Sequence, residues 1–216
     1  ALMYNDLTLA FWLIVAGIVF DFFDGFVARL LHSSSAIGVQ LDSLADVITS
    51  GLAPAAVLWQ VCLQTEPCWL PETWKLGYGV FVLAAFSALR LAKFNIDETQ
   101  TVEFCGLPTP AGSLLCASLG MLWQQGAVAL SSDGVLLIAV LTSLLLVSPI
   151  RMFALKFHGF GWRGNEVRYL FLLASIVLII ILRTYAIPVI IVLYIVVSAV
   201  RWLCMRSGNP DKAPKA

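Results

Sequence analysis

Stretches of about 20 nearly uninterrupted apolar residues recur along this chain of 216 residues. An α-helix needs about that length to cross the hydrocarbon core of a bilayer. The chain is 60% hydrophobic and only 12% charged, whereas an ordinary soluble domain is about 25% charged. We therefore predict an all-α fold, a polytopic bundle of membrane helices. The seven predicted spans cover residues 9–30, 42–63, 76–94, 110–128, 134–155, 167–183 and 185–205.

A single membrane domain is predicted for residues 1–206, followed by a disordered cytoplasmic tail at 207–216. The tail is small, polar and contains two prolines, a composition that cannot bury an apolar core. The loop at 64–75 contains two tryptophans and two prolines and is expected to cap the external side, because tryptophan favours the bilayer interface. The longest polar interruption, 95–109, leads through a glycine- and proline-containing turn into the next helix.

The basic residues predict which ends of the spans face the cytoplasm. If residues 32–41 lie on that side, the alternation of spans puts 95–109, 156–166 and the C-terminal tail there too. All Lys and Arg residues except Lys75 and Arg183 then lie at or near cytoplasmic ends. This is the bias that the positive-inside rule requires.

Four aspartates interrupt the apolar sequence near that face. Asp21 and Asp24 lie in one predicted helix, and Asp42 and Asp46 lie in the next. Their spacings of three and four residues put each pair on one helix face, and a turn containing Gly38 would bring the two faces together. A carboxylate in lipid costs roughly 2.5 kcal/mol or more, so the cluster needs a compensating partner. A divalent cation would neutralise the mutual repulsion of these acids.

The ligand types predict which metals suit this site. Carboxylate oxygens favour magnesium, manganese or calcium over zinc, which prefers His and Cys, and both His32 and His158 lie outside the motif. Gly25 and Ala28 have small side chains that let a helix or ligand approach the backbone. Arg29 has the planar fork that suits a phosphate. Together these features predict a metal site for a phosphate-rich substrate.

Two other interpretations of the aspartates remain open. They could form structural pairs with Arg29, Arg90 and Arg151, or line the ion pathway of a cation transporter. A transport pathway predicts acids spread over several spans at midplane depth. Here the acids gather on two neighbouring helices, with glycine and arginine between them, which favours the metal site.

The acidic stretch resembles the signature of the CDP-alcohol phosphotransferase family at every fixed position. It reads Asp21-Phe-Phe-Asp24-Gly25-Phe-Val-Ala28-Arg29 and, after eight residues, Gly38-Val-Gln-Leu-Asp42-Ser-Leu-Ala-Asp46. Segments 88–95, 104–111 and 148–151 resemble the membrane-spanning phosphatidylserine synthases within that family, the last one as part of a later helix. Two positions depart from their pattern, namely Lys93 and Pro149.

The resemblance implies an enzyme of phospholipid biosynthesis that transfers the phosphatidyl group of CDP-diacylglycerol to the hydroxyl of L-serine and releases CMP. It implies two divalent cations, Mg or Mn and otherwise Ca, bound by the four aspartates, with Asp46 also acting as general base. It further implies that CDP and its pyrophosphate contact Gly25, Ala28, Arg29 and Gly38.

The acceptor is the less constrained part of this assignment. The carboxylate of serine needs a cationic partner, and the polar candidates at cytoplasmic helix ends are Arg90, Asn95 and Arg151, with Arg90 the first choice. Interfacial snorkelling is an equal alternative for Arg151 and Lys93. The same chemistry with glycerol 3-phosphate or inositol phosphate remains open, although a phosphorylated acceptor would call for a denser basic cluster.

Members of the family usually have eight membrane helices, so the resemblance implies that one helix precedes residue 1. It also implies a homodimer in a bacterial inner or plasma membrane, with the active site facing the cytoplasm. The expected partners are CDP-diacylglycerol, L-serine and membrane lipids, and no nucleic acid.

Overall fold

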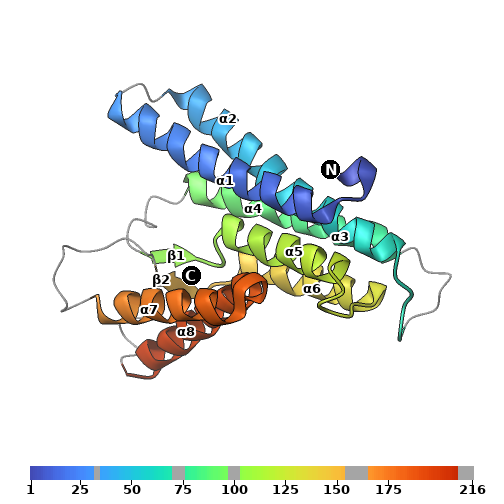
Figure 1. The fold of residues 1–216 in the computed structure, drawn as a ribbon. Coiled ribbons are helices and arrows are strands. Elements are labelled where there is room, and N and C mark those ends of the chain that lie inside the picture. The colour runs from blue at the N-terminus through green and yellow to red at the C-terminus, as the bar shows by residue number, and fades with distance from the viewer. Residues whose placement is uncertain (32–34, 70–75, 97–102, 154–164, 209–216) are drawn as a thin grey trace.

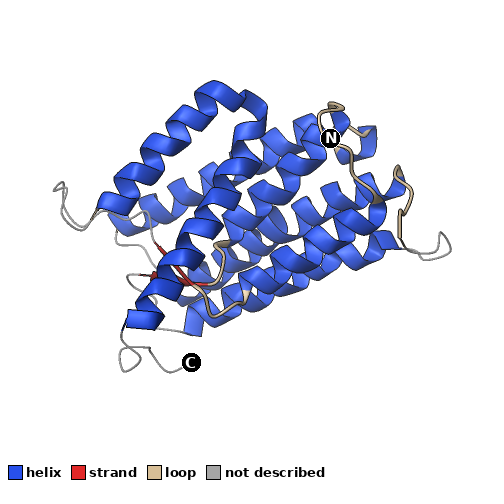
Figure 2. Cartoon of the chain, turned by 90° about the horizontal axis from the view of Figure 1, so that it is seen from below, coloured by secondary structure: helices blue, strands red, loops and turns tan. Residues whose placement is uncertain are grey.

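The computed structural model describes residues 1–31, 35–69, 76–96, 103–153 and 165–208. Eight α-helices in these ranges form a bundle (Figures 1 and 2). They are α1 (Leu7–Leu30), α2 (Ala36–Asp46), α3 (Ala53–Leu63), α4 (Val82–Ile96), α5 (Thr109–Gln124), α6 (Ser132–Leu146), α7 (Glu166–Leu182) and α8 (Ala186–Gly208). Shorter helical segments are η1 (Leu2–Tyr4), the π-helical η2 (Val47–Leu52), η3 (Leu76–Phe81) and η4 (Arg183–Tyr185).

Four helical stretches in the described ranges are long and apolar enough to cross a membrane, namely Leu7–Ala28, Ile37–Leu63, Gly77–Ile96 and Glu166–Cys204. The first three correspond to the first three predicted spans. The fourth, of 39 residues, bends back on itself at η4, where Arg183 has a φ of 48°. It therefore contains two predicted spans, 167–183 and 185–205, as the packed helices α7 and α8. Helices α5 and α6 have 16 and 15 residues.

Apolar side chains cover the outside of the bundle as well as its interior. On α7, Leu173, Ile180 and Ile181 are 60%, 72% and 69% exposed. A helix that is apolar on every side, and whose apolar side chains are not covered by neighbouring helices, suits contact with lipid. The prediction of an all-α membrane protein is confirmed at this level.

Helix α5 lies at the centre of the bundle and packs against α1, α3, α6 and α8. Small residues permit this close packing, as is common between membrane helices. A Cβ atom at Gly120 would lie only 2.3 Å from Cγ1 of Val57 on α3. The C-terminal end of α5 also holds the start of α1, because Oε1 of Gln124 accepts a hydrogen bond of 2.8 Å from the backbone N–H of Leu7.

The predicted span 134–155 is wrong over residues 147–153, and so is the helix expected at 148–151; residues 154 and 155 lie outside the described part of the chain. Helix α6 ends at Leu146, and strand β2 (Arg151–Phe153) follows it. Strand β2 pairs in antiparallel fashion with β1 (Glu103–Cys105), with Cys105 opposite Arg151. The predicted polar loop 95–109 therefore contains a short strand.

Proline chemistry and long-range hydrogen bonds explain this difference. Pro149 has no backbone N–H and disfavours helical geometry in the residue before it. The carbonyl of Leu145 accepts from the backbone N–H of Leu107, and the carbonyl of Ile150 accepts from that of Gly106, each at 2.9 Å. These bonds replace the helical ladder with a junction between β1, α5 and α6.

The predicted tail begins at residue 207, whereas α8 continues to Gly208. Residues 209–216 of the predicted tail lie outside the described part of the chain.

Candidate active site

Helices α1 and α2 lie side by side as a hairpin that extends from one end of the bundle (Figure 1). The start of α2 is capped by Ser35, whose Oγ accepts a hydrogen bond of 3.0 Å from the backbone N–H of Gly38. A Cβ atom at Gly38 would lie 3.0 Å from that oxygen. A glycine at this position therefore leaves room for the cap, which is a structural role beside the one the resemblance implies.

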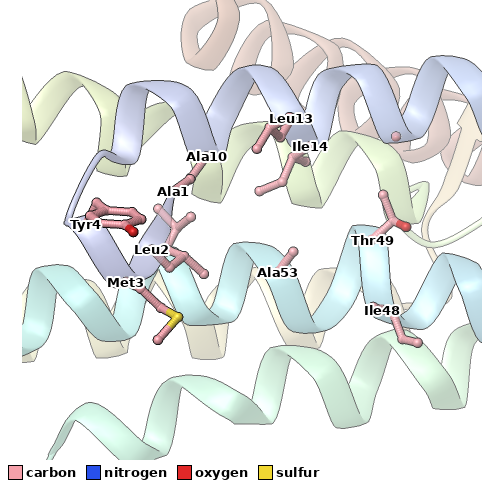
Figure 3. A pocket seen from close by; sticks show the side chains of 12 residues that line it. Ala1, Leu2, Met3, Tyr4, Ala10, Leu13, Ile14, Ile48, Thr49 and Ala53 are labelled. Carbon is pink, nitrogen blue, oxygen red and sulfur yellow. The ribbon is translucent and has the colours of Figure 1, made fainter.

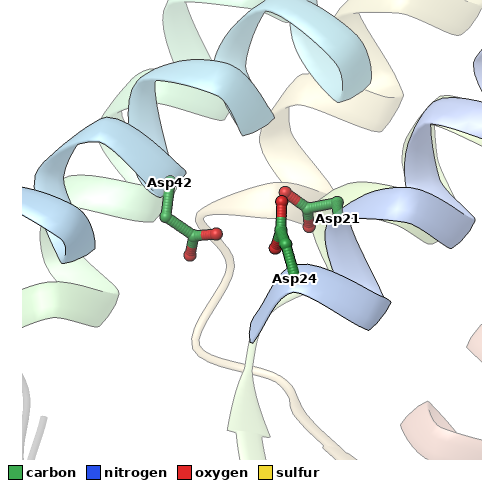
Figure 4. Close-up of side chains that lie close together, drawn as sticks. All are labelled: Asp21, Asp24 and Asp42. Atoms are coloured by element: carbon green, nitrogen blue, oxygen red, sulfur yellow. The ribbon is translucent and has the colours of Figure 1, made fainter. Parts of the chain in front are cut away.

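The hairpin brings the aspartates of its two helices together. One carboxylate oxygen each of Asp21, Asp24 and Asp42 lies within 4.8 Å of the others, and Figure 4 shows the three side chains pointing toward a common space. The Asp46 carboxyl group lies within hydrogen-bonding distance of that of Asp21. Asp24 and Asp42 are exposed, whereas Asp21 and Asp46 are half-buried. All four predicted ligands thus meet at one place.

The geometry of this cluster fits a hard divalent cation. Oxygen ligands lie about 2.0–2.1 Å from magnesium and about 2.3–2.6 Å from calcium, so two ligands of one ion can be up to roughly 4–5 Å apart. The oxygens of Asp21, Asp24 and Asp42 lie within 4.8 Å of one another, which is inside the limit for calcium and about half an ångström beyond that for magnesium. Each ligand is a carboxylate, the donor type that these ions prefer.

Directly after Asp46 the helix widens into the π-helical turn η2, in which the backbone N–H of Ala53 bonds to the carbonyl of Ile48. Such turns are rare and often occur at functional sites. Here the turn packs against α1, because a Cβ atom at Gly17 would lie 2.6 Å from Cγ2 of Thr49. Gly17 lies one helical turn before Asp21. This contact therefore holds the two acid-bearing helices close together.

Arg90 on α4 lies next to the acids. The residue is only 8% exposed, and its side chain interacts electrostatically with Asp46. Nη1 of Arg90 donates a hydrogen bond of 2.9 Å to Oγ1 of Thr109. The guanidinium carbon also lies 5.9 Å from the centre of the Phe94 ring. The first-choice acceptor residue is thus close to the proposed base.

The two other predicted acceptor residues have different surroundings. Nδ2 of Asn95 donates a hydrogen bond of 2.8 Å to Oγ of Ser43, so Asn95 ties α4 to α2 one residue after Asp42. Arg151 is exposed on β2, opposite Cys105, which itself lies close to Arg90. Asn95 therefore has a structural contact beside its predicted role, and Arg151 lies at the strand pair that flanks Arg90.

The predicted contacts of CDP lie on the same hairpin. Gly25 and Ala28 are half-buried positions of α1, one and two turns beyond Asp21. The backbone of Arg29 belongs to α1, but its side chain lies outside what the structure describes.

An apolar pocket of about 470 Å³ lies between the N-terminal residues, α1 and the helix formed by η2 and α3 (Figure 3). Leu13 and Ile14 of α1 and Ile48 of η2 contribute to its lining, which also includes Gly17 and Thr49. Such a lining suits a hydrocarbon group and offers little to a phosphate. The pocket thus shares the Gly17–Thr49 contact with the acidic hairpin.

Sequence analysis missed two contributors to this region. Thr109 was predicted only as part of the segment 106–110, which would restart a helix after a turn or shape the acceptor pocket, and its bond to Arg90 was not predicted. Tyr194 of α8 also interacts electrostatically with Arg90, and its hydroxyl donates a hydrogen bond of 2.9 Å to the carbonyl of Phe153 on β2. No local pattern indicates either contact, because each joins elements far apart in the chain.

Comparisons with known proteins agree with this architecture. The sequence model of the CDP-alcohol phosphatidyltransferase family matches residues 1–149. The chain is similar to the CDP-diacylglycerol–serine O-phosphatidyltransferase of Bacillus subtilis, with 32% identity over 159 residues that cover 74% of this chain and 82% of the relative. The enzyme of that name from Helicobacter pylori strain 26695 is 31% identical, over 90% of this chain and 80% of its own length. The one from Mycobacterium tuberculosis strain H37Rv is 34% identical, over 94% of this chain and 73% of its own length. The chain therefore belongs to the CDP-alcohol phosphatidyltransferase family and is a transferase of the membrane.

Proposed function

We propose that this enzyme transfers the phosphatidyl group of CDP-diacylglycerol to the hydroxyl of L-serine, giving phosphatidylserine and CMP. The observation that carries the proposal is the convergence of Asp21, Asp24, Asp42 and Asp46 beside the buried Arg90. The names of the relatives in Bacillus subtilis and Helicobacter pylori support serine as the acceptor.

The four aspartates would hold two divalent cations, magnesium or manganese and otherwise calcium. The shared space between the Asp21, Asp24 and Asp42 carboxylates supports this assignment. When bound, such cations offset the negative charge that develops on phosphoryl oxygens and on the departing nucleotide. CDP and its pyrophosphate would contact the neighbouring residues of the hairpin, Gly25, Ala28, Arg29 and Gly38.

Asp46 would act as the general base. A serine hydroxyl is a weak nucleophile at neutral pH and needs a proton acceptor within hydrogen-bonding reach. As the new bond forms between the serine oxygen and phosphorus, the hydroxyl proton moves to a carboxylate oxygen of Asp46, and the bond between phosphorus and the CMP oxygen breaks. The half-buried position of Asp46 between Asp21 and Arg90 supports this role.

Arg90 would bind the carboxylate of serine, with Arg151 as a further contact. Arg90 is the basic residue whose interaction with the proposed base is evident, and its planar fork suits a carboxylate. Asn95, which is tied to α2 by its bond to Ser43, would be the third contact of the acceptor. Acceptors such as glycerol 3-phosphate or inositol phosphate carry more charge and would favour a denser basic cluster.

We further propose seven membrane spans within a single domain, 1–206. Five of them lie in the four longer stretches, because the last stretch contains both α7 and α8. The other two are α5 and the part of α6 from residue 134 onward. The end of α1, the start of α2, the end of α4 and the strand pair lie toward the same end of the bundle (Figure 1). The positive-inside rule would place that end and the active site in the cytoplasm of a bacterium. The enzyme would work there as a homodimer.

CMP release by the purified full chain tests the proposed function. The protein is incubated with CDP-diacylglycerol and Mg²⁺ or Mn²⁺, and with L-serine, glycerol 3-phosphate or inositol phosphate in turn. We expect release that depends on serine. Faster release with a phosphorylated acceptor would overturn the serine assignment. Metal flux into proteoliposomes that lack CDP-diacylglycerol, without CMP release, would support the transporter interpretation instead.

A further inference from the structure

We propose that Thr109 is a positioning residue that orients the Arg90 guanidinium and thereby sets the affinity for the carboxylate of the acceptor. This inference rests on the proposed function, because it concerns how the same site recognises serine. Thr109 is the first residue of α5 and is buried, with only 1% of the residue exposed.

The hydrogen bonds of Arg90 show which of its guanidinium nitrogens already has a partner. Nη1 is held by Oγ1 of Thr109 at 2.9 Å. Nε is buried and has no hydrogen-bond partner among the residues that the structure describes. An unpaired N–H of a charged group away from water is costly, so a ligand that accepts from it is favoured. A carboxylate suits the Nε side of the guanidinium, because a guanidinium binds carboxylates through neighbouring N–H groups.

The surroundings of the guanidinium leave Thr109 as the contact that sets its rotation. The Phe94 ring supports one side at 5.9 Å. Asp46 and Tyr194 interact with Arg90 electrostatically, and the Tyr194 hydroxyl is already engaged with the carbonyl of Phe153. Charge attraction alone does not select which N–H group points to the acceptor. The directional bond to Thr109 does so by holding Nη1.

Thr109 is itself rigidly placed. Leu107, two residues earlier, donates its backbone N–H to the carbonyl of Leu145 at 2.9 Å. Pro108 forms the cap of α5 and restricts the backbone. A hydroxyl on this support can hold a long side chain in one orientation, which reduces the entropy that Arg90 would lose on binding an acceptor.

Thr109→Val and Thr109→Ser separate this role from simple packing. Valine keeps the shape and removes the hydroxyl, whereas serine keeps the hydroxyl. In Thr109→Val we expect the KM for L-serine to rise about tenfold, which corresponds to about 1.4 kcal/mol, with kcat and the KM for CDP-diacylglycerol nearly unchanged. Thr109→Ser should retain a KM for serine close to that of the wild type.

Thr142→Val is the matched control, because Thr142 is also buried and its hydroxyl accepts a hydrogen bond from Sγ of Cys116, at 3.9 Å, away from Arg90. Its KM for serine should not change. An unchanged KM in Thr109→Val, or equal increases for both substrates, would overturn the inference. If Thr109→Val does not fold, Thr109→Ala must show the same selective increase. Failure of the wild type to use serine would instead refute the proposed function.

Discussion

Replacing Gly106 by alanine should destabilise the protein and weaken its use of serine together. Gly106 joins β1 to the start of α5 and has a φ of +76°. An L-residue in this left-handed region costs about 1–2 kcal/mol. The added Cβ atom would also lie 2.2 Å from the carbonyl oxygen of Leu146 and 2.9 Å from its carbonyl carbon. Because these are backbone atoms, no side-chain rotation can relieve the overlap, and the junction itself must move.

Movement of the junction breaks two backbone hydrogen bonds. The N–H of Gly106 bonds to the carbonyl of Ile150, and the N–H of Leu107 to that of Leu145, both at 2.9 Å. Each such bond contributes about 1 kcal/mol net. Added to the conformational cost, the expected loss of unfolding free energy is about 3–4 kcal/mol. The same movement displaces Thr109, so the KM for serine should rise.

Gly126→Ala is the matched control for the steric part of this estimate. Gly126 also has a positive φ, +68°, but a Cβ atom there would meet nothing within 4 Å. Only the conformational cost of about 1–2 kcal/mol should then appear. The unfolding free energy of both variants is measured by unfolding the detergent-solubilised full chain with increasing SDS. A difference between Gly106→Ala and Gly126→Ala below about 1 kcal/mol would refute the idea of a rigid junction.

Three further outcomes are expected. Asp46→Asn should abolish CMP release while the protein stays folded, since the base is lost without a change of shape; near-normal turnover would exclude Asp46 as base. Removal of divalent metal with EDTA should stop CMP release, and added Mg²⁺ or Mn²⁺ should restore it; turnover without metal would contradict the aspartate site. Outside the candidate spans, hydrogen bonds from the Ser131 side chain and from the backbone of Cys68 and Trp69 lower the pKa of Asp133 to about 2. The native state thus binds a proton at Asp133 less readily than the unfolded state does. The ionised Asp133 carboxylate should therefore stabilise the native state fully above about pH 4, and this contribution should be lost as the pH falls toward 2. SDS unfolding should show that loss in the wild type but not in Asp133→Asn.

The residue spacing predicted much of the acidic cluster. A helix brings residues three and four positions apart onto one face, so the pairs Asp21–Asp24 and Asp42–Asp46 could be assigned to faces without a structure. The length of the apolar stretches likewise predicted the helices that contain them. The chemical roles of these residues stay predictions.

The predictions failed or were incomplete where a contact joins distant parts of the chain. Residues 148–153 were assigned to a helix, but Ile150 instead bonds to Gly106 in another segment. The bond from the Asn95 amide to Ser43 was not predicted either. The π-helical turn after Asp46 could not be predicted either, because it depends on how closely α1 approaches Thr49.

The sequence by itself determined that this is a helical membrane protein with paired acids on two neighbouring helices. Both properties are local, since they follow from apolar length and from the helical period. Only the tertiary structure decided that Thr109 holds Arg90 and that strands lie where a helix was expected. Those contacts depend on the packing of segments that are far apart in the chain, and no short pattern encodes the distance between them.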